Sequence, residues 1–202
     1  MDPRQAARSL EVIRTLMERT TQYQLLTARA GLTAGALACV GSLSFCWLDP
    51  ANATSFGVVW ALVFLGSLQA TIAEVVMRGR RNGEPLWSRQ ARTVVCALTP
   101  ALASALLLTV WLFGRGEHLW LPGVWLLCYG QGALATSSYA PAPIRWMGGA
   151  ALVMGGLALW VGPAWAIPIM GVGFGLSHLS LGAALLVAGK RQRQLRLHRC
   201  VA

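Results

Sequence analysis

The residues best suited to chemistry are polar side chains set inside long apolar stretches: Gln69, Glu74, Tyr129, Gln131 and His178. A carboxylate beside an imidazole can pass a proton, hold a cation or bind a polar headgroup. When the two stretches are aligned on their tryptophans, Glu74 and His178 fall at similar depth. The pattern therefore predicts a possible intramembrane polar site formed by Gln69, Glu74, Gln131 and His178.

Glu74 and His178 also have a purely structural interpretation. Glu74 lies one helical turn before Arg78, and an ion pair at this spacing would hold the carboxylate at a membrane interface. His178 could simply hydrogen-bond to a neighbouring helix. Counted from the basic segments that follow them, the two residues lie at different depths, which favours separate roles.

Enzyme motifs are missing from the sequence. The chain has no HExxH, GxSxG, SxxK or Walker A pattern, and only one acidic residue falls inside an apolar stretch. The five cysteines form no CxxC pair and are expected to be small packing residues. We therefore predict no enzyme activity, no catalytic residue, no metal site and no cofactor.

Long apolar segments must position the polar residues. The chain of 202 residues is 55% hydrophobic and 12% charged, and its mean hydropathy is +0.55. Stretches close to the ~20 residues that cross a bilayer are Ala30–Leu48, Phe56–Met77, Thr93–Phe113, Leu119–Ser138, Ile144–Val161 and Ala164–Ala188. The predicted fold is an all-α membrane protein, a six-transmembrane-helix bundle over residues 30–189. An N-terminal amphipathic helix within residues 1–29 precedes it, and a basic tail over residues 190–202 follows it.

Basic residues lie almost entirely on one side of this predicted bundle. Of the 17 Lys and Arg residues, all but Arg115 fall before the first span, in alternate loops or after the last span. Loops rich in Lys and Arg stay in the cytoplasm, so both termini are predicted to be cytoplasmic. Because the net charge of +10 lies beside apolar segments, we expect anionic lipid headgroups as partners and not nucleic acid.

Both chain ends could contact a partner on the cytoplasmic side. Residues 3–27 carry Leu10, Ile13 and Met17 at helical spacing, with arginines around them. Such a helix could lie on the inner leaflet or dock a cytoplasmic protein. The residues predicted to contact lipid or a partner protein are Arg8, Arg14, Arg19, Arg80, Arg81, Lys190, Arg191 and Arg193.

A loose internal pattern links the second, fourth and sixth stretches. Each has a tryptophan followed by glycine, and the Pro-to-Gly spacing is equal at Pro122/Gly130 and Pro163/Gly171. The pattern is compatible with three helical hairpins related by a weak repeat, or with coincidence. Pairs of small residues four apart, such as Gly31/Gly35, predict close helix packing, while the oligomeric state stays open.

Three segments carry a family likeness: Ile13 to Arg19, Leu121 to Gly130 and Gly173 to His178. Together they resemble a group of small, uncharacterised bacterial six-span inner-membrane proteins, often encoded beside a winged-helix regulator. The resemblance implies a multi-pass protein of the bacterial cytoplasmic membrane with an accessory or regulatory role. It carries over no catalytic residue.

Two functions from different classes follow from these patterns. The first is a non-enzymatic membrane protein that acts as an accessory or regulatory subunit, or as a membrane tether, for a cytoplasmic partner. The alternative is a small transporter or channel with a polar path through Gln69, Glu74, Gln131 and His178. An enzyme acting on lipid is the third and weakest interpretation.

Overall fold

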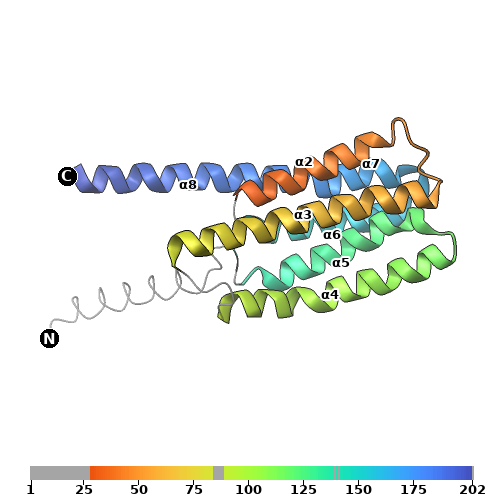
Figure 1. Cartoon of the computed structure of the whole chain (residues 1–202), viewed down its shortest axis with the longest axis horizontal. Helices are drawn as coiled ribbons and strands as arrows, with labels where there is room; N and C mark the ends of the chain where they lie inside the picture. Colours follow the sequence, from red (N-terminus) through yellow and green to blue (C-terminus); the bar gives the residue numbers. More distant parts are fainter. Residues whose placement is uncertain (1–27, 84–88, 139, 141, 202) are drawn as a thin grey trace.

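The computed structural model describes residues 28–83, 89–138, 140 and 142–201 (Figure 1). Every regular element in these ranges is helical, which confirms the all-α prediction. The predicted amphipathic helix over 3–27, with Arg8, Arg14 and Arg19, lies outside the described residues. The helices are α2 (Ala28–Ser44), α3 (Ala53–Asn82), α4 (Arg89–Gly114), η1 (His118–Trp120), α5 (Leu121–Thr136), α6 (Ala142–Val161), η2 (Pro163–Trp165), α7 (Ala166–Met170), η3 (Gly171–Leu176) and α8 (Ser177–Val201).

Four helical stretches in the described ranges are long and apolar enough to cross a membrane. They are Ala53–Arg81, Ala91–Gly114, Ala142–Val161 and Pro163–Arg191. The other two predicted spans correspond to shorter helices, α2 with 17 residues and α5 with 16. At 1.5 Å per residue, these rise only about 25 Å, somewhat less than the ~30 Å apolar layer. Within the described ranges the protein is therefore all-helical, with four candidate membrane-spanning helices.

The first and fourth predicted spans are longer than the helices that form. Within the stretch Ala30–Leu48, the α-helix ends at Ser44. Backbone hydrogen bonds, such as that from the Phe45 N–H to the Ser42 carbonyl, then fold the chain into a turn. The stretch Leu119–Ser138 begins in η1 and becomes an α-helix only at Leu121, where Pro122 suits a helix start. Hydropathy does not locate the helix ends here, because the turn residues that flank these two helices are apolar too.

Glycines mark the two closest helix contacts. A methyl group added at Gly130 would lie 2.8 Å from the Gly148 carbonyl oxygen, and one at Gly123 would lie 3.2 Å from that of Gly155. These pairs place α5 and α6 antiparallel with their backbones nearly touching. A methyl group at Gly35 on α2 would similarly lie 2.7 Å from the backbone nitrogen of Leu179 on α8. Only glycine allows such approach, as expected for helices that pack within lipid.

The remaining helices cover these two pairs. α4 packs along α5, and α3 packs along α2 through Gly41, where a methyl group would meet Val63 at 2.6 Å. α3 also contacts α4 and α5 at one end of the bundle, where Phe56 is buried with Leu112 and Leu121. We call this the aromatic end, because Phe45, Trp60, Phe113, Trp120 and Trp125 surround these three residues.

The opposite end of the bundle is basic. It contains the start of α2 with Arg29, the end of α3 with Arg78, Arg80 and Arg81, and Arg145 at the start of α6. α8 runs past the other helices at this basic end and carries Lys190 and Arg191 (Figure 1). The one basic residue predicted on the other side, Arg115, lies at the aromatic end, with its guanidinium 4.6 Å from the centre of the Trp111 ring. The charge segregation seen in the sequence is thus also a spatial segregation.

Candidate functional site

A tyrosine and a histidine pair in the interior of the bundle. The hydroxyl of Tyr129 on α5 lies 2.8 Å from Nε2 of His178 on α8, and Nδ1 of His178 lies 2.7 Å from the Phe174 carbonyl oxygen. The three rings also pack on one another, with Tyr129 and His178 centroids 5.3 Å apart. Both polar residues fall near the middle of their helical stretches, Leu121–Thr136 and Pro163–Arg191.

The Phe174 carbonyl determines the direction of these hydrogen bonds. A carbonyl oxygen only accepts, so Nδ1 of His178 must carry the proton and donate. In the neutral imidazole, Nε2 is then an acceptor, and the Tyr129 hydroxyl donates to it. Both ring nitrogens of His178 are therefore paired, and the hydrogen bond from Tyr129 ties α5 to α8.

The helix that carries His178 is interrupted just before it. Residues Gly171–Leu176 form a π-helical turn between α7 and α8. Pro168, one turn earlier, has no amide hydrogen to donate, and the glycines in the turn allow a wider backbone. π-turns inside α-helices occur frequently at functional sites, because they rotate the residues that follow. The turn presents the Phe174 carbonyl to the His178 ring.

The polar pair also lies between two groups of core residues. Tyr129 packs against the buried cluster that contains Ile144, Met147 and Leu181, and against a second cluster that contains Leu126 and Ile169. A paired hydrogen bond in such surroundings can fix the relative position of helices, or it can open and bind a polar group. Both uses rely on the same two side chains.

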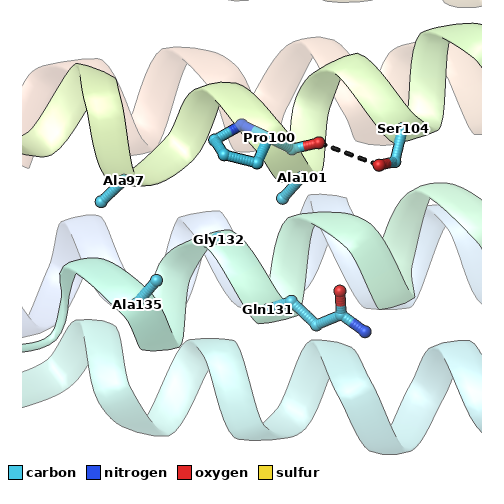
Figure 2. Close-up of a pocket in the computed structure, with 7 residues that line it drawn as sticks. All are labelled: Ala97, Pro100, Ala101, Ser104, Gln131, Gly132 and Ala135. Carbon is cyan, nitrogen blue, oxygen red and sulfur yellow. Dashed lines mark hydrogen bonds between the residues drawn. The ribbon is translucent and has the colours of Figure 1, made fainter.

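The other three predicted site residues do not join His178. Glu74 and Gln69 lie on α3, which packs on α2 and is not a principal neighbour of α8. Glu74 is partly buried, and it forms no ion pair with Arg78 or any other residue in the described ranges. Gln131 is two residues from Tyr129 and therefore faces away from His178. It is exposed beside a groove between α4 and α5 (Figure 2).

The structure thus pairs His178 with Tyr129 and not with Glu74. Tyr129 belonged to the short set of polar residues in apolar stretches, but the predicted site did not include it. An additional signal was available, since proline and three glycines precede His178 and favour an interrupted helix. Which helix would face that interruption could not be read from the sequence.

A second histidine, which the sequence analysis did not select, is buried at the aromatic end. His118 in η1 is 4% exposed, and its Nε2 donates to the Pro50 carbonyl at 3.1 Å. The rings of Phe56 and Phe113 lie 5.1 and 5.7 Å from its own. Its Nδ1 is buried without a partner in the described part of the chain. His118 therefore joins the turn after α2 to the turn after α4.

Metal-binding geometry is not found within the described ranges. No group of three or more His, Cys, Asp or Glu side chains lies close enough there to hold an ion. Cys39, Cys46, Cys96 and Cys128 are all free thiols. Cys39 packs against Gly175: a methyl group added at Gly175 would lie 2.5 Å from the Cys39 sulfur.

Comparison with known proteins found no matching family model, no matching curated protein and no matching solved structure. The resemblance to small bacterial six-span inner-membrane proteins therefore stays a prediction. The functional argument depends on the geometry of the chain itself.

Proposed function

We propose that this chain is a non-enzymatic integral membrane protein that acts as an accessory or regulatory subunit, or as a membrane tether, for a partner protein. It crosses the bacterial cytoplasmic membrane six times with both termini in the cytoplasm. In this orientation the basic end meets the cytoplasm and the anionic headgroups of the inner leaflet. The aromatic end, with its many tryptophans, meets the opposite interface.

One observation carries this proposal: two helices extend basic side chains beyond the packed bundle. Every residue of α8 from Leu186 to Arg191 is exposed, so this segment extends beyond the helices that pack on the rest of α8. On α3, Arg80 and Arg81 are exposed just before the helix ends at Gly83, whose φ of 66° stops it. An exposed basic helix end can bind an acidic protein surface or anionic lipid.

The proposal can be tested with a photo-crosslinking residue placed at each end of the bundle in native membranes. A probe at Arg80 or Lys190 is expected to capture one defined protein partner, and a probe at Arg115, at the aromatic end, is expected to capture none. With the probe at Arg80, replacing Arg81, Lys190 and Arg191 with glutamine should then reduce the yield at least tenfold. A basic residue beside an anionic membrane surface is worth about 1 kcal/mol, and we expect a similar contribution beside acidic side chains. Arg115→Gln is the matched control. Equal yields from both ends, or lipid adducts alone at the basic end, would contradict a protein partner.

The six-span topology gives a separate prediction that includes the two shorter helices, α2 and α5. In a chain whose five natural cysteines are replaced by serine, Arg115→Cys should react with an impermeant thiol reagent outside the cell. Arg81→Cys should react only after the membrane is opened. If α2 and α5 did not cross and the N-terminus stayed in the cytoplasm, α3 would end outside and the two results would be exchanged.

A transporter or channel is a second candidate, and the interrupted helix is the observation that favours it. Transporters commonly bind substrates near the bilayer midplane, beside a break in a helix. The π-helical turn at Gly171–Leu176, with His178 and Tyr129 beside it, is such an arrangement. It supports only the His178 part of the polar path, since Gln69, Glu74 and Gln131 lie elsewhere.

A further inference from the structure

The groove between α4 and α5 has a polar group at its rim. It is a shallow, open groove with a volume of about 270 Å³, and Ala97 and Ala101 of α4 face Gly132 and Ala135 of α5 across it (Figure 2). Gln131 lines the same groove and is exposed. Leu108, one helical turn beyond Ser104 on the same face of α4, is 40% exposed and adds an apolar side chain to this surface. In a membrane this surface meets lipid or another protein.

The Gln131 carboxamide has hydrogen-bonding capacity that the rest of the described chain does not use. It can donate two hydrogen bonds and accept two, yet it makes none with the described residues. Ser104, on the same groove, differs: its hydroxyl donates to the Pro100 carbonyl at 2.9 Å. An unpaired amide facing hydrocarbon costs several kcal/mol, so it favours any partner that can pair with it inside the membrane.

We infer that a second copy of this chain covers the groove, and that the two Gln131 carboxamides hydrogen-bond to each other across a twofold axis normal to the membrane. A carboxamide is its own complement, because the donor of one meets the acceptor of the other. Copies inserted in the same orientation hold Gln131 at the same depth, so the pair needs no shift of either molecule. An isologous interface of this kind is the usual form of a homodimer.

The walls of the groove also fit a neighbouring helix. Alanine and glycine at Ala97, Ala101, Gly132 and Ala135 leave room for a side chain or backbone to enter. Leu108 extends the contact along α4. The carboxamide pair would supply orientation, and the small and aliphatic residues would supply packing.

The test measures dimerisation of the full chain in lipid vesicles by energy transfer between copies carrying donor and acceptor dyes. The wild-type protein should dimerise, and Gln131→Leu should weaken dimerisation about tenfold. Gln69→Leu is the matched control, because Gln69 is an equally exposed carboxamide on α3. It should leave dimerisation unchanged. The paired-carboxamide interface would be overturned if Gln69→Leu lost the dimer, or if Gln131→Leu dimerised as strongly as the wild-type protein.

A crosslinking experiment decides the case even if Gln131→Leu folds poorly. In the cysteine-free chain, Ser104→Cys should form a disulfide-linked dimer under mild oxidation. Ser180→Cys, an exposed serine on α8, should stay monomeric. Monomer from both variants would overturn the proposal and leave a lipid or lipid-soluble ligand as the occupant of the groove. None of these substitutions alters the basic end, so the result does not depend on the proposed partner there.

Discussion

Gly155→Leu is expected to destabilise the bundle severely, while Gly156→Leu, one residue further along α6, is expected to be nearly neutral. A methyl group at Gly155 would already lie 2.7 Å from the backbone nitrogen of Leu127 and 3.0 Å from the Gly123 carbonyl oxygen. Backbone atoms cannot turn aside as a side chain can, so α5 and α6 would have to separate. Overpacking of this kind costs about 3 kcal/mol.

Gly156 is the control because it lies on the same helix at nearly the same depth, but on the face turned away from the neighbouring helices. It is exposed, and an added methyl group there would meet nothing within 4 Å among the described residues. A leucine side chain would extend into lipid. Thermal unfolding in one detergent, followed by tryptophan fluorescence, should show a much lower midpoint for Gly155→Leu alone. Similar midpoints for the two variants would mean that α5 and α6 are not in close contact.

The second large effect is expected at the Tyr129–His178 pair. Tyr129→Phe leaves Nε2 of His178 without its donor, and His178→Leu leaves the Tyr129 hydroxyl unpaired inside the bundle. Each single change should cost about 1–3 kcal/mol. The double variant should cost less than the sum, with a coupling free energy of about 1 kcal/mol between the two residues, as found for hydrogen bonds between membrane helices. The measurement is a double-mutant cycle on unfolding in one lipid–detergent mixture.

A second double-mutant cycle, which combines His178→Leu with Glu74→Gln, serves as the control. Because α3 and α8 are not principal packing partners, these two changes should be additive. Strong coupling between Glu74 and His178 would instead support the shared polar site suggested by the sequence. The same variants separate the two functional proposals: a solute flux lost in Tyr129→Phe and His178→Leu, but kept in Glu74→Gln, would favour transport through the interrupted helix.

The lengths and contacts of individual helices show where sequence reasoning succeeds. Apolar runs of membrane length predicted α3, α4, α6 and the helix from Pro163 to Arg191, and these four are confirmed as candidate spans. The runs around α2 and α5 were also helical, but their ends were misplaced, since turn residues such as Phe45 and Leu119 are apolar too. Charge asymmetry set Arg115 apart from the other basic residues, and the basic residues in the described ranges, such as Arg29, Arg81 and Arg145, do lie at the opposite end of the bundle.

The sequence by itself therefore determined the class of protein, the apolar helices and the segregation of charge, because each of these follows from local composition. Only the tertiary structure decided which polar residues meet. Glu74 and His178 matched in depth only when their helices were aligned on the tryptophans, and depth in any case carries no information about which helices are neighbours or which faces they turn to each other. The glycine contacts of α2 with α8 and of α5 with α6, together with the π-helical turn before His178, determine that arrangement. They bring Tyr129 to His178, and they leave Gln131 facing outward.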